Sequence, residues 1–389
     1  MKIHFLGVAG SGASAAAEIA RSQGYVVSGC DKELNGHSPN HLKNIDILAV
    51  TPAIFSLDPQ NPELLEAKKL GIPIMTWQEF MGKYLQRQKF VIAISGTHGK
   101  TTTTAMIGTL LEDAGLDPTV ELGAEVFKWK ANFRIGQGKY FVCEADEYND
   151  NFLNFKPDIA VVTNIEMDHP EYFKDFVAVK KSFEKFKKKS KKVFDKPNPK
   201  LINFSLQIPG DFNILNASLA FQVGLLLGIN PLKIKQSLSS YSSVGRRFEY
   251  LGDFQKAKIY SDFGHHPTEI KVTMEAARQK FPKQKIWLIY EPHMFTRTKA
   301  FFKNFVKVFR EIPVDKIIIT DIYQSREIDK GLVNSKQLVE AVNKENTFYI
   351  SKKELKNYLE KVVSENDVVF FMGAGDIDKL ARNFVNLPD

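Results

Sequence analysis

Cysteine and long apolar runs are both scarce in this 389-residue sequence. The two cysteines, Cys30 and Cys143, lie in apolar runs typical of strands, which argues against a disulfide framework and favours a reducing compartment. The most apolar stretch, Ala217 to Ile229, is shorter than the ~20 residues that a membrane-spanning helix needs. The apolar run at the N-terminus is too short for a signal peptide. We therefore expect a cytoplasmic protein that does not bind membranes.

The sequence also has no internal repeat, no low-complexity tract and no interleaved arginine and aromatic pattern of the kind that binds nucleic acid. The net charge is +8, but the segment from Lys180 to Lys196 alone holds nine lysines and two acidic residues. Phe183 and Phe186 in this segment have the spacing of one buried helical face, so we interpret the lysines as the solvated side of an amphipathic helix. Attraction of an anionic substrate or partner is the alternative. Nucleic-acid binding is not expected.

Short β-rich runs alternate with helical patterns along the whole chain, which predicts an α/β fold of parallel sheets covered by helices. The length suggests two or three domains. We expect three: a Rossmann-like domain at residues 1–88, a central P-loop ATPase-type parallel-sheet domain at 89–244, and a Rossmann-like α/β domain at 245–389. Within the central domain, a strand is expected at Leu201–Phe204, after the lysine-rich helix.

The most informative motif runs from Phe90 to Thr102. An apolar strand, Phe90–Ser95, enters a glycine loop, and a helix follows directly, so backbone N–H groups and a helix N-terminus converge on one point that suits a phosphate chain. Lys100 can neutralise phosphate charge and the Thr101 hydroxyl can bind magnesium. The pattern has Ile94 where the usual nucleotide-binding loop has glycine. The alternative is a helix that is merely capped by a Gly-Lys-Thr turn.

Acidic side chains follow two further apolar runs. The run from Tyr140 to Glu147 ends in three carboxylates, and the run from Ala160 to His169 ends in Asn, Glu, Asp and His. Parallel strands that end together would bring these groups to the sheet edge that holds the phosphate loop. Clustered carboxylates repel one another without a cation, and magnesium would supply one.

A second glycine loop, Gly7 to Gly12, follows the first expected strand, and Asp31 closes the next one. The arrangement is similar to the dinucleotide-binding fingerprint, in which an acidic residue meets a ribose hydroxyl. Its glycine spacing differs from G-x-G-x-x-G. The loop therefore indicates a pyrophosphate ligand without distinguishing NAD from a UDP-sugar, and a tight turn with no ligand is the alternative.

Motifs along the whole chain carry a family resemblance. They are Gly96–Thr103, Glu144–Glu147, Thr163–His169, Gly210–Ala217, Arg246–Phe248, Asp262–Ile270, Glu291–Thr298 and Met372–Ile377. On these residues the sequence resembles the Mur ligase family, the ATP-dependent amide-forming enzymes of peptidoglycan precursor synthesis. It looks most similar to the members that join L-alanine to UDP-N-acetylmuramate.

The resemblance implies a role for each domain: the first binds the UDP-sugar, the second ATP, and the third the amino acid and part of the nucleotide. The implied UDP-sugar contacts are Gly10, Ser11, Gly12, Asp31 and His37. The implied ATP contacts are Gly96, Thr97, Gly99, Lys100, Thr101, Thr102, Asn213, Arg247 and Asp262. The implied magnesium ligands are Thr101 and Glu144 for one ion and His169 for a second. The implied catalytic residues are Lys100, Glu144, His169, His265, His266, His293 and Arg297, of which the last four face the incoming amino acid and the lactyl carboxylate.

Two of these assignments have structural alternatives. The pair His265 and His266 could simply form a turn, and Arg247 could be a surface residue, as most arginines are. The chemistry that the resemblance implies has two steps. Phosphate transfer from ATP activates the carboxylate as an acyl phosphate, and the amine then displaces phosphate. The protein would act as a monomer or homodimer.

The sequence departs from the family in three respects. It is shorter between Asp31 and Ile45 and between Phe186 and Gly210, which suggests a minimised enzyme. Phe212 stands where histidine is usual. Met294 stands where a basic or polar residue is usual, which leaves the choice of amine open.

Three other functions stay open at this point. One is a ligase that recycles a tripeptide onto the same nucleotide sugar, and another is a nucleotide-binding module without turnover. The third is a nicotinamide-dependent dehydrogenase, which the first glycine loop alone would allow.

Overall fold

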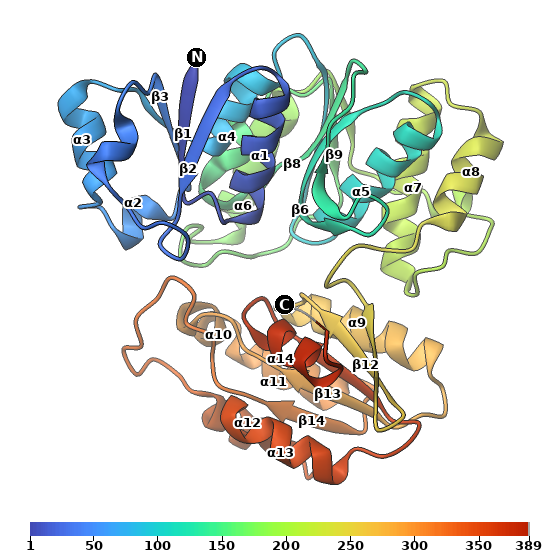
Figure 1. The fold of residues 1–389 in the computed structure, drawn as a ribbon. Helices are drawn as coiled ribbons and strands as arrows, with labels where there is room; N and C mark the ends of the chain where they lie inside the picture. Colours follow the sequence, from blue (N-terminus) through green and yellow to red (C-terminus); the bar gives the residue numbers. More distant parts are fainter. Residues whose placement is uncertain (388–389) are drawn as a thin grey trace. The chain divides into compact units, whose positions relative to one another are not determined.

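The computed structural model describes residues 1–387 and contains three β-sheets with helices packed against them (Figure 1). The chain divides into two compact units. The first unit comprises residues 1–166, 176–205 and 215–241, and the second comprises residues 167–175, 206–214 and 242–389. The first two sheets belong to the first unit and the third sheet belongs to the second unit. The expected boundaries after residues 88 and 244 stay a prediction.

The first sheet has four parallel strands in the order β2-β1-β3-β4. Its strands are β1 (Lys2–Leu6), β2 (Val26–Cys30), β3 (Ile47–Val50) and β4 (Ile74–Thr76). Its helices are α1 (Ser11–Ser22), η1 (Pro39–Leu42), α2 (Ile54–Leu57), α3 (Pro62–Leu70), α4 (Trp77–Phe80) and η2 (Met81–Leu85). Helix α1 buries a face of alanines and also packs against two strands of the second sheet, which joins the first two sheets in one unit.

The second sheet has six strands in the order β10-β9-β5-β8-β6-β7, and all of its pairs are parallel except β6 with β7. Its strands are β5 (Phe90–Ser95), β6 (Thr119–Val126), β7 (Ala131–Arg134), β8 (Tyr140–Glu144), β9 (Ile159–Val162) and β10 (Lys192–Phe194). The helices of this region are α5 (Lys100–Asp113), η3 (Tyr148–Asn154), α6 (Phe176–Lys188), η4 (Pro199–Leu201), α7 (Asp211–Leu226) and α8 (Pro231–Ser240).

The third sheet also has six strands, in the order β11-β12-β16-β13-β14-β15, with one antiparallel pair, β11 with β12. Its strands are β11 (Glu249–Phe254), β12 (Ala257–Asp262), β13 (Ile286–Tyr290), β14 (Lys316–Ile319), β15 (Thr347–Tyr349) and β16 (Val368–Met372). One hydrophobic core lies between this sheet and α9 (Pro267–Lys280), α11 (Phe302–Glu311) and α12 (Ser335–Val342). A second core lies between the sheet and α13 (Lys352–Val362) and α14 (Ile377–Phe384). Helices therefore cover both faces, as the sequence predicts.

The lysine-rich segment is only partly a helix. Phe183 and Phe186 are fully buried on α6, which confirms the amphipathic interpretation, but the helix ends at Lys188. The strand expected at Leu201–Phe204 is wrong, because the segment after the helix forms its strand earlier, as β10, by pairing with β9. A strand requires a neighbouring strand to hydrogen-bond, and the local sequence pattern does not reveal that neighbour.

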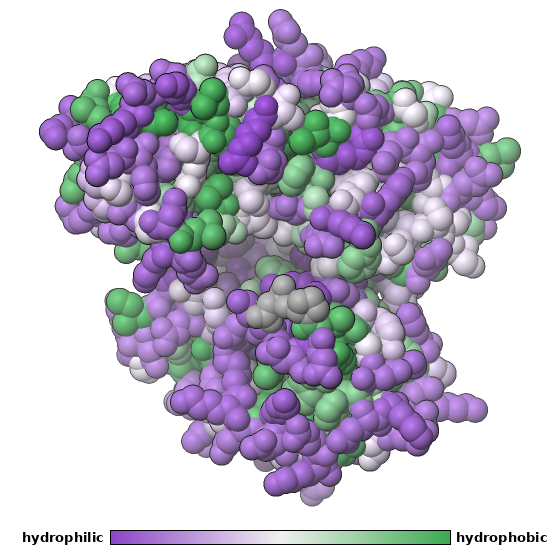
Figure 2. Space-filling view, viewed as in Figure 1, coloured by the Kyte–Doolittle hydropathy of each residue, from purple (hydrophilic) through white to green (hydrophobic). Residues whose placement is uncertain are grey.

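The visible surface is mostly hydrophilic, with hydrophobic side chains in small separate patches (Figure 2). Among residues 1–387, no helix combines the length and the hydropathy that crossing a bilayer would demand.

Candidate active site

The phosphate loop lies at the carboxyl end of β5, where β8 and β9 flank that strand on either side. Two of its glycines are required by space as well as by conformation. Gly96 has φ 137°, and a Cβ there would lie 2.0 Å from the Thr163 hydroxyl. Gly99 has φ 80°, and a Cβ there would lie 2.7 Å from the Asn216 amide oxygen. The loop conformation therefore excludes side chains at both positions.

The residues that follow β9 fix the shape of the loop. The Asn164 side chain accepts from the His98 N–H at 3.0 Å and donates to the His98 carbonyl at 3.0 Å. The Thr97 hydroxyl accepts from the Glu166 N–H at 2.8 Å. The motif after the strand placed Asn164 near the loop, but its contacts with His98 were not predicted.

Lys100 begins α5, and its ammonium donates to the Gly96 carbonyl at 2.6 Å and to Glu147 at 2.9 Å. Burial by itself would lower the pKa of Lys100, but Glu147, Asp146 and Glu144 together raise it above its usual value. The ammonium is therefore held fully charged at the start of the helix, where it suits a polyphosphate. Glu147 lies within the predicted acidic motif, but its pairing with Lys100 was not predicted.

Several acidic side chains lie near Lys100 in the first unit. Glu144, at the end of β8, accepts from the Gly123 N–H at 2.8 Å. Burial, and then the charge of Glu144, raise the pKa of Glu121 well above its usual value. The Thr101 side chain is buried in the first turn of α5, and Thr97 and Thr102 are also buried. Oxygen atoms of this kind are the ligands that magnesium prefers.

The N-terminal glycine loop connects β1 to α1 as expected, and Ser11 begins the helix. Asp31 accepts from the Ala9 N–H at 3.2 Å, so this carboxylate helps to fix the backbone conformation of the loop. Packing alone requires glycine at position 12, whether or not a ligand binds, because a Cβ at Gly12 would lie 2.4 Å from the ring of Trp77. His37 lies against Cys30, with 3.3 Å between Nδ1 and Sγ.

In the second unit, Arg297 and Asp168 form a buried ion pair. Their side chains are 2% and 8% exposed, and the guanidinium lies 2.8 Å from the carboxylate. His169 lies beside the pair, 3.5 Å from Arg297, in the left-handed region with φ 52°. Burial would raise the pKa of Asp168, but His169 and Arg297 hold it far below its usual range. Asp168 was among the polar residues expected after the strand, but its pairing with Arg297 was not predicted.

His265 and His293 lie next to this ion pair, and their ring centroids are 5.4 Å apart. Burial and the neighbouring Arg297 lower the pKa of His265 well below 6.5 and that of His293 to about 3. Both imidazoles are therefore neutral at physiological pH. Tyr323, which no motif pointed to, stacks on His293 with 5.9 Å between centroids.

The remaining predicted residues of the second unit hold their segments in place. His266 caps α9 by accepting from the Thr268 N–H at 3.2 Å. Asp262 accepts from the N–H groups of Phe248 and Gly264 at 2.9 and 2.8 Å. Burial raises the pKa of Asp262 against the opposing charge of Arg247. These contacts give both side chains structural functions besides any contact with a ligand.

Arg247 and Asn213 are both placed by near neighbours within the second unit. The Arg247 guanidinium lies over the Phe263 ring at 5.0 Å. The Asn213 amide donates to the Pro209 carbonyl at 2.7 Å. Neither contact by itself indicates a nucleotide.

Met294 is buried and has φ 68°, a conformation that bulky residues rarely adopt. It precedes the short helix α10 (Phe295–Ala300), and its N–H donates to the Tyr323 carbonyl at 2.9 Å. The strain is stored next to His293, which is typical of functional segments. The methionine side chain itself packs inward.

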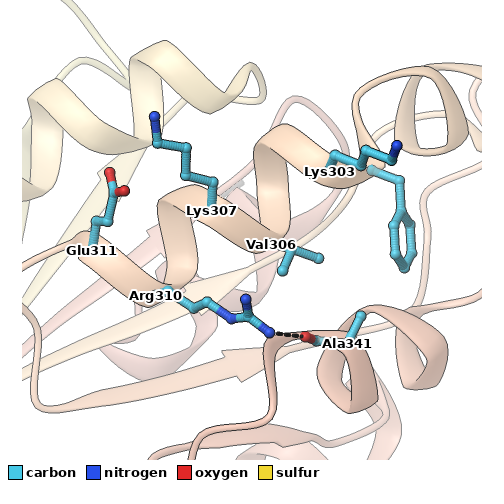
Figure 3. A pocket seen from close by; sticks show the side chains of 7 residues that line it. Lys303, Val306, Lys307, Arg310, Glu311 and Ala341 are labelled. Carbon is cyan, nitrogen blue, oxygen red and sulfur yellow. Dashed lines mark hydrogen bonds between the residues drawn. The ribbon is translucent and has the colours of Figure 1, made fainter.

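A shallow groove of about 540 Å³ lies between α11 and α12 (Figure 3). It is lined by Phe302, Lys303, Val306, Lys307, Arg310, Glu311 and Ala341. Arg310 donates to the Ala341 carbonyl at 2.7 Å, and none of the predicted site residues lines the groove. The groove therefore has no part in the candidate active site.

Three family models match successive parts of the chain. The model of the Mur ligase family catalytic domain matches residues 2–89, the Mur ligase middle domain matches residues 94–194, and the Mur ligase glutamate ligase domain matches residues 246–375.

Curated relatives match over nearly the full length. The chain is 35% identical to the UDP-N-acetylmuramate–L-alanine ligase of Alkaliphilus metalliredigens, covering 98% of this chain and 96% of the relative. It is 36% identical to the ligase of the same name from Acetivibrio thermocellus, with 98% and 95% covered. The first alignment spans 447 residues, so it includes stretches for which this 389-residue chain has no counterpart.

Two solved structures have a fold similar to that of this chain. The UDP-N-acetylmuramate–alanine ligase of Thermotoga maritima superposes with a TM-score of 0.81 at 27% identity, covering 99% of this chain and 98% of the other. A murein peptide ligase of Psychrobacter arcticus shares the fold with a TM-score of 0.67 at 19% identity, covering 99% and 98%.

Proposed function

We propose, since this chain belongs to the Mur ligase family, that it joins L-alanine to the carboxylate of UDP-N-acetylmuramate at the expense of ATP, in peptidoglycan precursor synthesis. The observation that carries the proposal is the likeness to L-alanine-adding ligases over 98% of the chain, together with an intact phosphate loop. Nucleotide substrates of this kind are consistent with a cytoplasmic enzyme.

The first step requires activation of a carboxylate, which is a poor electrophile. Transfer of the terminal phosphate of ATP would convert it to an acyl phosphate, and the protein's contribution is positioning and charge neutralisation. The loop N–H groups and the charged Lys100 supply that neutralisation from the first unit. Glu147 holds the Lys100 ammonium at the mouth of the loop.

Magnesium is part of this proposal: Thr101 and Glu144 would hold one ion, and His169 would hold a second. When bound, the cation would neutralise further phosphate charge. The buried threonine hydroxyls at the start of α5 and the nearby carboxylates offer the oxygen ligands that a hard cation prefers.

The second step is attack by the amine, and we assign His265, His293 and Arg297 to it. Because both imidazoles are neutral, they suit hydrogen bonds to an incoming polar group, and they would not repel a cationic amine. Arg297 is paired with Asp168, so it acts chiefly by positioning that carboxylate and its histidine neighbours. No covalent protein nucleophile is needed.

A phosphate-release assay with a panel of amines tests the proposal. Release should require ATP, magnesium, UDP-N-acetylmuramate and an amine together, and L-alanine should give a higher kcat/KM than glycine, L-serine or the tripeptide. Preference for the tripeptide would reassign the chain to peptide recycling. Release that is unchanged without the sugar nucleotide would refute the ligase function.

A further inference from the structure

A cluster of side chains with metal-binding chemistry lies in the first sheet region, among residues that no step of the ligase reaction uses. It consists of His4 on β1, Cys30 at the end of β2, His41 on η1 and Glu63 at the start of α3, and we refer to it as the Glu63 cluster. His37 adjoins it. Three of the eight histidines and one of the two cysteines of the chain therefore gather around one carboxylate.

Glu63 is fully buried, and within residues 1–387 its carboxylate contacts histidines, a cysteine and a backbone N–H rather than a lysine or arginine. One carboxylate oxygen, Oε1, lies 3.0 Å from Cys30 Sγ, 3.0 Å from His41 Nδ1 and 3.0 Å from the Ser38 N–H. Carboxylate, thiolate and imidazole groups are all known ligands of zinc in proteins.

The other oxygen, Oε2, faces His4 in an unusual way. The two atoms Oε2 and His4 Nε2 are 3.1 Å apart, but neither has a hydrogen-bond partner within the described part of the chain. Both side chains are almost completely buried, at 0% and 2% exposure. The two atoms are therefore in ion-pair contact but poorly aligned for a hydrogen bond, and a cation bound between them would give both a ligand bond instead.

The dimensions of the cluster suit a small cation. One ligand atom from each of the four side chains lies within 4.8 Å of all the others. Tetrahedral zinc with nitrogen and oxygen ligands at about 2.1 Å places its ligand atoms about 3.4 Å apart. Small movements of side chains would therefore close the cluster around an ion.

The surroundings also have the features of a metal site. The His4 Nδ1 is held by the Ser28 hydroxyl at 2.8 Å, which fixes the ring and directs Nε2 toward Glu63. Outer-shell hydrogen bonds of this type orient the histidine ligands of metals. The His41 side chain is 25% exposed, so an ion could enter from its side.

We propose that the Glu63 cluster binds one zinc ion through His4, Cys30, His41 and Glu63. The set of two imidazoles, a thiolate and a carboxylate favours zinc over magnesium or calcium, which prefer oxygen ligands alone. Zinc displaces the thiol proton of Cys30 when it binds the sulfur, and the proton passes to solvent. The ion would link β1, β2, η1 and α3. The cluster adjoins the glycine loop, because the N–H groups of Gly7 and Val8 donate to the Cys30 carbonyl at 2.9 and 3.1 Å.

The alternative is a metal-free polar network in which the thiol and the imidazoles donate to Glu63. The two possibilities predict different zinc binding by the full-length protein. The protein is treated with a chelator, returned to buffer with excess magnesium so that oxygen-rich sites are filled, and titrated with zinc against a chromophoric chelator. We expect one tightly bound zinc per chain, and absence of stoichiometric binding would overturn the proposal.

Cobalt replaces zinc as a spectroscopic probe of the ligands. Cobalt bound to the wild-type protein should show tetrahedral visible bands and a thiolate-to-metal charge-transfer band in the near ultraviolet. Spectra of octahedral cobalt without a thiolate band would contradict the assignment. This measurement needs no variant.

Cys30→Ser should abolish the charge-transfer band and weaken zinc binding at least about tenfold, and His41→Asn should weaken it similarly. Cys143→Ser is the matched control, because Cys143 is the other buried cysteine of the same unit and lies outside the cluster. It should bind zinc as the wild type does. Thermal unfolding without metal checks that the variants fold, and unchanged affinity in folded Cys30→Ser would place any bound zinc elsewhere.

Discussion

The phosphate loop in the first unit and the histidine cluster in the second unit both bury ionisable groups, but they hold those groups in opposite charge states. Around Lys100, three carboxylates outweigh burial and keep the ammonium charged. Around His265 and His293, burial and Arg297 act in the same direction and keep the imidazoles neutral. The comparison shows that burial alone does not decide the charge of a site; the sign of the neighbouring charges does.

The largest effect is expected at the charged side of this comparison. Lys100→Ala removes the cation that faces the phosphates and should lower kcat by roughly 10³-fold or more, by analogy with other phosphoryl-transfer cations. The phosphate-release assay measures this. Lys191→Ala is the control, since Lys191 is an exposed lysine of the same unit that pairs with Asp158, and its turnover should be unchanged.

Lys100→Ala also leaves Glu147, which is 2% exposed, without its cation. Lys100→Ala with Glu147→Gln should therefore unfold at a higher temperature than Lys100→Ala alone while remaining inactive. Turnover close to wild type in either folded variant would contradict the role of Lys100.

The next effect tests whether Arg297 positions its neighbours. Arg297→Met removes the guanidinium that pairs with the buried Asp168, which should destabilise the protein by about 3–5 kcal/mol. Adding Asp168→Asn should restore much of that stability without restoring activity. Chemical denaturation measures both variants, and an Arg297→Met protein as stable as the wild type would show that the ion pair is not what holds the cluster.

The neutral histidines predict a stability that depends on pH. A histidine whose pKa is lowered on folding binds fewer protons folded than unfolded, so its contribution is full above about pH 6.5 and is lost as the pH falls toward its folded pKa. For His293, with a pKa of about 3, the unfolding free energy should fall by up to about 1.4 kcal/mol per pH unit between pH 6.5 and 4.5. His293→Gln should lack this component, so identical pH slopes for the two proteins would contradict the prediction.

The smallest effect is expected at the edge of the cluster. Arg326 forms an ion pair with Glu171, and both side chains are partly exposed, at 25% and 15%. Arg326→Gln should change kcat/KM by less than about tenfold, because exposed ion pairs contribute little. Since Arg326 also lowers the pKa of His293, the variant should raise that pKa, which NMR titration of the imidazole would measure.

Local sequence predicted the phosphate-loop region well. The strand Phe90–Ser95 is observed at its predicted bounds, and the helix expected after the glycine loop begins at Lys100. The error at Leu201–Phe204 shows the limit, because that run has the composition of a strand but β9 pairs with residues 192–194 instead.

The partners of the predicted residues were harder to foresee. Glu147 and Asp168 stood inside recognised motifs, but only the folded chain pairs them with Lys100 and Arg297. Tyr323 came from no motif at all.

The sequence by itself determined the phosphate loop, because its strand, glycines, lysine and helix are consecutive and their backbone conformations follow from local sterics. Only the tertiary structure decided which buried groups carry charge, and that His4, Cys30, His41 and Glu63 meet. Burial and Coulomb interactions depend on residues that are distant in the chain, so no local pattern can encode them.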